Sequence, residues 1–137
     1  IKLLQPVHKK ALVLGTGGAS KAVQYVLHKL GIDYLVVSRN KSIQKNFIQY
    51  NEITATIIDE HKIIINCTPL GMAPAVNTCP NIPYALLTAN HYLYDLVYKP
   101  ETTLFLQKGE QKGANTCNGF EMLVLQAEEN WRIWNEE

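Results

Sequence analysis

The sequence lacks several features that would assign it to whole classes of protein. Its 137 residues carry 13 Lys and Arg against 12 Asp and Glu, a formal net charge of only +1. Such a balance gives no general electrostatic field for nucleic acid or an anionic membrane. The longest apolar runs, such as residues 12–14 and 63–65, are far shorter than the about 20 residues of a membrane span. We therefore expect neither a nucleic-acid partner nor a membrane partner.

Cysteine is scarce as well. The three cysteines, Cys67, Cys79 and Cys117, are an odd number, are widely spaced and form no CxxC motif. A disulfide framework and a zinc site both need a different pattern, so we expect no metal. A reducing compartment fits this pattern best, which favours a cytoplasmic location. The remaining composition, 47% hydrophobic and 18% charged, is that of a folded globular protein.

Short β-branched runs alternate with helical segments along the chain, which is typical of an α/β domain with a parallel sheet. No repeat or change of composition divides the sequence, so we expect a single domain over residues 1–137. The expected fold is a doubly wound, Rossmann-like, mostly parallel six-stranded sheet with helices on both faces. The expected strands are 10–14, 34–37, 47–50, 62–66, 91–97 and 114–117. The expected helices are 18–30, 54–61, 102–112 and 118–134, with room for only about one helical turn at 41–45.

The strongest local signal is a glycine-rich loop between the first expected strand and the first expected helix. Glycine suits a sharp turn and allows the backbone to approach a pyrophosphate closely. The following helix directs free N–H groups and the positive end of its dipole at the anion. The alternative is an ordinary turn with incidental glycines, which the strand–loop–helix context disfavours. The residues predicted to bind the pyrophosphate are Gly15, Thr16, Gly17, Gly18 and Ala19, with Ser20 replacing the usual third glycine.

The end of the second expected strand indicates which dinucleotide is bound. NAD-selective folds usually place Asp or Glu there to bind the ribose hydroxyls. This chain has Ser38, Arg39, Asn40 and Lys41 instead. A guanidinium binds a 2′-phosphate that a carboxylate would repel, so we predict NADP as the cofactor. The alternative is a solvated loop that happens to carry two cations.

Three further segments are expected to end at the same edge of the sheet, where open α/β sheets bind ligands. They are residues 66–72, 94–100 and 118–126. Leu96 is placed to form an apolar wall for the nicotinamide, and Gly119 to let the ring approach the backbone. Tyr98 and Gln126 are placed to offer hydrogen bonds to a hydroxylated substrate. Each of these residues, taken alone, also has an ordinary structural explanation.

The order of these motifs resembles the C-terminal NADP-binding domain of the shikimate dehydrogenase family, from about Lys10 to Trp134. The resemblance implies reduction of 3-dehydroshikimate to shikimate with NADPH, a step toward chorismate and the aromatic amino acids. It also implies that Leu96 and Gly119 lie at the nicotinamide, that Tyr98 and Gln126 reach the substrate, and that Thr68 neighbours the nicotinamide ribose. Many relatives carry a second arginine where Ile43 stands here. The matching motifs are GTGGASKA (15–22), SRN (38–40), NCTPLGM (66–72), YDLVYKPETTLFL (94–106) and NGFEMLVLQAEENWRIW (118–134).

The chain offers no convincing proton donor for a ketone oxygen, so we expect no catalytic residue within it. None of the four histidines accompanies the motif loops. The resemblance implies that a lysine and an aspartate of an N-terminal substrate domain serve at the carbonyl. We expect that domain to precede Ile1, and this chain alone to be inactive.

Three other readings of the sequence stay open. One is an NAD(P)-dependent quinate/shikimate dehydrogenase domain. Another is a different two-domain NADP enzyme, such as a methylene-tetrahydrofolate dehydrogenase or a glutamyl-tRNA reductase, which the segments at 94–100 and 119–126 disfavour. The third is a stand-alone nucleotide-binding module without chemistry, for which Tyr98 and Gln126 would have no use.

Overall fold

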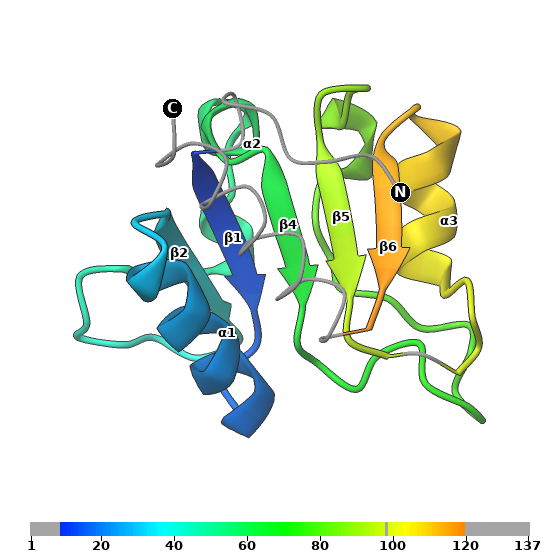
Figure 1. The fold of residues 1–137 in the computed structure, drawn as a ribbon, viewed down its shortest axis with the longest axis horizontal. Helices are drawn as coiled ribbons and strands as arrows, with labels where there is room; N and C mark the ends of the chain where they lie inside the picture. The colour runs from blue at the N-terminus through cyan, green and yellow to red at the C-terminus, as the bar shows by residue number, and fades with distance from the viewer. Residues whose placement is uncertain (1–8, 98, 120–137) are drawn as a thin grey trace.

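The computed structural model describes residues 9–97 and 99–119, and these form one six-stranded sheet with helices packed on it (Figure 1). The strand order is β3-β2-β1-β4-β5-β6, and every neighbouring pair is parallel. The strands are β1 (Lys10–Leu14), β2 (Asp33–Ser38), β3 (Phe47–Gln49), β4 (Ile63–Asn66), β5 (Tyr92–Asp95) and β6 (Asn115–Asn118). The helices are α1 (Gly18–Lys29), α2 (Ala55–Glu60) and α3 (Leu104–Gln111), with 3₁₀ turns η1 (Tyr50–Glu52) and η2 (Tyr84–Leu86).

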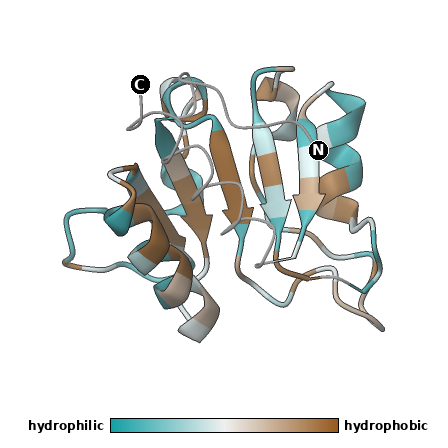
Figure 2. Cartoon of the chain, in the orientation of Figure 1, coloured by the Kyte–Doolittle hydropathy of each residue, from teal (hydrophilic) through white to brown (hydrophobic). Residues whose placement is uncertain are grey.

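The central strands are buried on both faces. Successive residues of each strand point to opposite sides of the sheet, and helices cover each side. In β1, Ala11 and Val13 pack in one core cluster with Val23 and Leu27 of α1. Leu12 and Leu14 pack in a second cluster, which holds the buried residues of α2 and α3. The central strands β1 and β4 are accordingly hydrophobic except at Lys10, which begins β1, and Asn66, which ends β4 (Figure 2). The predicted doubly wound sheet with helices on both faces is confirmed.

Helix α1 ends where the sequence places its stop. Gly31 has φ +73°, and its N–H bonds to the carbonyl of His28 while Ile32 N–H bonds to Leu27 O at 2.9 Å. This pair of bonds satisfies carbonyls of the last turn and needs a left-handed residue, which glycine adopts without strain. The turn then delivers the chain into β2 beside β1.

Between β2 and β3 the sequence leaves room for only about one helical turn, and the structure has no helix there: residues 43–45 form a bend and a turn. The hydroxyl of Ser42 accepts a hydrogen bond from the Gln44 N–H at 3.2 Å, a local bond that competes with helix formation. The edge strand β3 is nevertheless present, paired through Val36 and Phe47. Residues 39–46 therefore join two parallel strands without a helix.

The two C-terminal strands are displaced slightly from their predicted bounds. The strand expected over 91–97 ends at Asp95, because the Asp95 carboxylate accepts a hydrogen bond from the Val97 N–H at 2.9 Å and turns the chain. The expected last helix, 118–134, lies outside the described residues apart from its start. Asn118 ends β6, and its side chain donates to the carbonyl of Glu101 at 2.8 Å. In the described part of the chain, no helix is long and apolar enough to cross a membrane.

Candidate functional site

A cleft of about 800 Å³ opens at the carboxyl ends of the strands. It lies where the strand order changes direction between β1 and β4, the position at which open α/β sheets bind ligands. The cleft joins the glycine loop after β1 to the loop after β2. Its lining residues are Gly15, Thr16, Gly17, Val37, Ser38, Arg39, Asn40, Gln49, Tyr50, Asn51, Cys67, Thr68, Pro69, Leu70, Cys79 and Asn81.

Within the glycine loop, Gly15 is required by the backbone itself. Its φ is +108°, and its N–H donates to Val37 O at 2.9 Å, which ties the loop to β2. A Cβ at this position would lie 3.1 Å from Thr68 Cγ2. The loop therefore passes close over the start of the segment after β4, and a larger residue would push the two apart.

The next two glycines leave room for a ligand rather than for a neighbouring chain. A Cβ on Gly17 or Gly18 would meet nothing within 4 Å. Gly17 is the N-cap of α1, and no side chain caps the helix. The first turn carries no acidic residue, so its N–H groups and dipole present positive potential at the cleft. Ser20 is fully buried, as expected for a small residue that replaces the third glycine.

The loop after β2 supplies the one charged residue among the described lining residues, Arg39. Ser38 ends the strand, and its hydroxyl accepts a hydrogen bond from the Asn40 N–H at 3.1 Å. The side chain of Gln49 in β3 donates to the Arg39 carbonyl at 3.4 Å, which fixes the backbone while the Arg39 side chain stays exposed. No carboxylate stands among these described residues, so the local field favours an anion.

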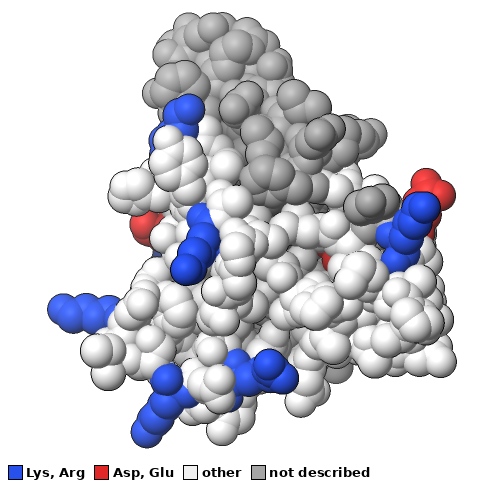
Figure 3. All heavy atoms as spheres, turned by 90° about the horizontal axis from the view of Figure 1, so that it is seen from below, with Lys and Arg blue, Asp and Glu red and all other residues white. Residues whose placement is uncertain are grey.

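Figure 3 looks onto this edge of the molecule. Lys and Arg side chains project from it at several places, whereas Asp and Glu are few. Lys41 is exposed on the same loop as Arg39 and does not line the cleft, and the side chain of Ile43 is fully exposed, at 103%. The chain thus offers Arg39 as its cleft-lining cation, with Lys41 farther out.

The remaining predicted residues divide into three groups. Thr68 lines the cleft. Four others lie at the same edge of the sheet but are not part of the cleft lining: Gly18, Ala19, Leu96 and Gly119. Two of these are held by backbone hydrogen bonds, from Leu96 N–H to Asn66 O and from Gly119 N–H to Asp95 O. Tyr98 and Gln126 lie outside the described residues.

The structure adds residues that the sequence did not single out for the cleft. Gln49, Tyr50 and Asn51 come from β3 and η1, and Cys79 and Asn81 come from the proline-rich loop after β4. Burial raises the pKa of the Tyr50 hydroxyl, and the nearby positive charge of Arg39 acts in the opposite direction. In the sequence, only the short connection after Arg39 indicates that these residues reach the cleft, because it leaves no helix to cover this end.

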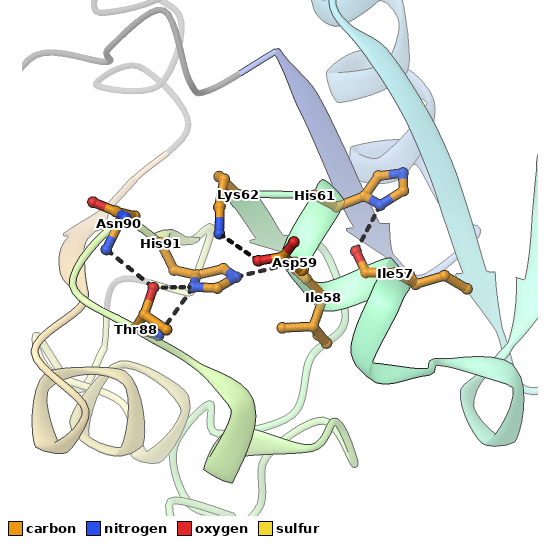
Figure 4. Close-up of polar contacts among 8 residues, drawn as sticks. All are labelled: Ile57, Ile58, Asp59, His61, Lys62, Thr88, Asn90 and His91. Carbon is orange, nitrogen blue, oxygen red and sulfur yellow. Dashed lines mark hydrogen bonds and ion pairs between the residues drawn. The ribbon is translucent and has the colours of Figure 1, made fainter.

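Two of the histidines lie elsewhere in the fold, near the amino ends of β4 and β5 (Figure 4). His91 is 1% exposed, and its Nε2 lies 2.8 Å from the carbonyl of Ile58, to which it donates. Its Nδ1 accepts a hydrogen bond from the Thr88 N–H at 3.0 Å. His61 is also buried, with Nδ1 2.7 Å from Ile57 O. Both histidines therefore serve the packing of α2.

Acid is expected to destabilise the protein through these two side chains. Burial lowers the pKa of both His91 and His61. In the unfolded chain a histidine has a pKa of about 6.5, so it binds a proton more readily there than in the folded protein. The free energy of unfolding therefore has its full value above about pH 6.5 and decreases as the pH is lowered further. Urea unfolding at a series of pH values measures this. His91→Gln should flatten the acid limb, and an acid limb in this variant as steep as in the wild type would contradict the role given to His91.

Curated relatives and solved structures that resemble the chain include several shikimate dehydrogenases. No family model matches the chain. A shikimate dehydrogenase (NADP(+)) of Desulforamulus reducens is 30% identical over 94% of this chain and 50% of its own length. A solved chorismate mutase/shikimate 5-dehydrogenase fusion protein from Clostridium acetobutylicum is 36% identical, with TM-score 0.67, over 93% of this chain and 46% of that one. Shikimate 5-dehydrogenase from Thermus thermophilus, in complex with NADP(H) and shikimate, is 28% identical, with TM-score 0.67, over 96% and 51%.

These matches cover nearly all of this chain and only part of each relative. The chain spans about half the length of the curated relatives it matches, and those relatives share one name. Over that length the chain is similar to the NADP-dependent shikimate dehydrogenases, as the motifs predicted.

Proposed function

We propose that this homologue of the shikimate dehydrogenases is the NADP-binding half of an enzyme that reduces 3-dehydroshikimate to shikimate. The single observation that carries the proposal is the cleft at the switch point of the sheet, which joins an uncapped helix N-terminus to Arg39. A doubly phosphorylated dinucleotide needs both features, one for its pyrophosphate and one for its 2′-phosphate.

Each segment at this edge of the sheet has a role in holding the cofactor. The backbone of residues 15–19 binds the pyrophosphate at the start of α1. The 2′-phosphate is bound by the loop after β2, through Ser38, Arg39, Asn40 and Lys41. Thr68 lies beside the nicotinamide ribose, and Leu96 and Gly119 lie beside the ring. NADPH supplies the hydride, while Tyr98 and Gln126 bind the hydroxylated substrate.

The proton that follows the hydride comes from outside this chain. A ketone oxygen that gains negative charge needs an acid or a cation beside it. The described lining of the cleft holds no His, Lys, Asp or Glu. The resemblance to the shikimate dehydrogenases implies that a lysine and an aspartate of a second, substrate-binding domain serve as this acid, with residues 1–137 forming one cofactor domain. The three free thiols suit a reducing compartment, which supports a cytoplasmic location.

The proposal predicts binding without turnover for the 137-residue chain. NADP+ should bind, and shikimate should give no detectable NADPH by absorbance, because the group that would take the proton from the substrate hydroxyl in this direction is missing. A longer chain that includes the substrate domain should turn over under the same conditions and serves as the positive control. Turnover by the short chain that disappears in Lys99→Ala would contradict the assignment, since Lys99 follows β5 at this edge of the sheet.

Two of the other readings are separated from this proposal by simple results. A quinate/shikimate dehydrogenase that uses NAD would bind NAD+ at least as tightly as NADP+. A nucleotide-binding module without chemistry would bind a cofactor and still show no turnover when the complete parent protein is assayed.

A further inference from the structure

The loops after β4 and β5 are joined at the cleft edge by a buried polar network. Asn66 and Asp95 end two neighbouring strands, and both side chains are fully buried. Asn66 Nδ2 donates to Asp95 Oδ1 at 3.1 Å. Burying an amide and a carboxylate costs free energy unless every polar atom finds a partner, so the other contacts of this pair decide what it does.

Asn66 uses all of its hydrogen-bonding capacity. Its Nδ2 also donates to the carbonyl of Leu70 at 3.3 Å. Its Oδ1 accepts from the Thr68 N–H at 3.0 Å and from the Thr68 hydroxyl at 2.6 Å. The Thr68 hydroxyl in turn accepts from the Leu70 N–H at 3.2 Å. One side chain therefore sets the path of residues 67–70, which form part of the cleft wall.

Asp95 holds the next loop at both of its ends. Its Oδ1 accepts from the Val97 N–H at 2.9 Å, and its Oδ2 accepts from the Thr103 hydroxyl at 2.6 Å. Thr103 is also the N-cap of α3. Three donors and no described cation surround this carboxylate; burial raises its pKa, and these hydrogen bonds act against that rise. Because all three neighbours donate, the ionised form is the one that the site fits.

The sheet order places this network at one particular part of the bound cofactor. Arg39 follows β2, the glycine loop follows β1, and Asn66 and Asp95 end β4 and β5. A dinucleotide with its 2′-phosphate at Arg39 and its pyrophosphate at the glycine loop extends toward β4 and β5 with its nicotinamide half. Neither Asn66 nor Asp95 is exposed to touch it, so any effect passes through Thr68 and the backbone at 96–97.

We propose that Asn66 and Asp95 are positioning residues that hold the loops after β4 and β5 against the nicotinamide half of the cofactor. The inference rests on the proposed function, because it presupposes that NADP occupies the cleft. If this is so, breaking the hydrogen bond between Asn66 and Asp95 weakens the binding of ligands that carry the nicotinamide half more than the binding of ligands that lack it. A purely structural role would weaken the binding of all ligands equally, or of none.

Two ligands separate these possibilities. NADP+ spans the whole cleft, whereas adenosine 2′,5′-bisphosphate carries the 2′-phosphate without the nicotinamide. Isothermal titration of both into the 137-residue chain gives the ratio of their dissociation constants. Asn66→Ser and Asp95→Asn should each raise the dissociation constant of NADP+ by about tenfold and that of adenosine 2′,5′-bisphosphate by less than about twofold.

Two more variants keep the test informative. Thr103→Val, close in shape to threonine, removes one donor to Asp95 and should shift the same ratio in the same direction even if Asp95→Asn does not fold. His91→Gln breaks buried hydrogen bonds at the opposite end of β5 and should lower stability without changing the ratio. Equal weakening of both ligands, or an unchanged ratio in folded variants, would overturn the inference. A wild-type chain that binds neither ligand would instead overturn the proposed function.

Discussion

Arg39→Asp is expected to weaken NADP+ binding by about 1–3 kcal/mol more than NAD+ binding, which is about 5- to 150-fold in the ratio of dissociation constants. Arg39 is the cation of the described cleft lining, and no carboxylate opposes it there. The substitution replaces attraction for the 2′-phosphate by repulsion, and NAD+ has no phosphate at that position. Titration of both cofactors into the wild type and the variant measures the ratio.

The matched control places the same charge reversal at the other end of α1. Lys29→Asp changes the net charge equally, but Lys29 lies in the last turn of a helix whose first turn faces the cleft. At physiological ionic strength, salt screens the interaction between charges at opposite ends of the helix. The ratio of the NADP+ and NAD+ dissociation constants should therefore stay near that of the wild type. Equal losses for NADP+ and NAD+ in Arg39→Asp would show that Arg39 does not discriminate between them.

Gly17→Val is expected to abolish measurable NADP+ binding while leaving the fold intact. The Gly17 backbone has φ −76° and ψ −167°, which a β-branched residue adopts without strain, and a Cβ there meets nothing within 4 Å. The added side chain would instead occupy the space in which the pyrophosphate approaches the start of α1. Titration gives the affinity, and thermal unfolding shows that the chain is folded.

The contrast with Gly15→Val, two residues earlier, makes this result specific. Gly15 has φ +108° and lies against Thr68, so valine there should lower the melting temperature as well as the affinity. A Gly17→Val protein that binds NADP+ as tightly as the wild type would place the pyrophosphate away from this loop.

The parts of the fold and site that the sequence predicted depend on local signals. A buried run followed by glycines and an amphipathic segment predicts strand, loop and helix within one stretch of chain, and β1 and α1 have nearly the predicted bounds. Ser38 and Arg39 follow directly from the end of β2. Parallel strands bring such loops to one edge of the sheet, which is why the cleft contains residues from three of the motifs.

The parts that the sequence did not predict depend on contacts between distant segments. Tyr50 reaches the cleft from η1 and Cys79 from the loop after β4, and neither residue belongs to a phosphate-binding pattern. The bond between Asn66 and Asp95 joins residues 29 positions apart, so no periodicity indicates it.

A crystal structure of the chain grown with saturating NADP+ shows directly where the cofactor binds. We expect the pyrophosphate over residues 15–17 at the start of α1 and the 2′-phosphate against the Arg39 guanidinium. A folded chain whose cleft stays empty under those conditions, or a cofactor bound with its 2′-phosphate away from Arg39, would contradict this expectation.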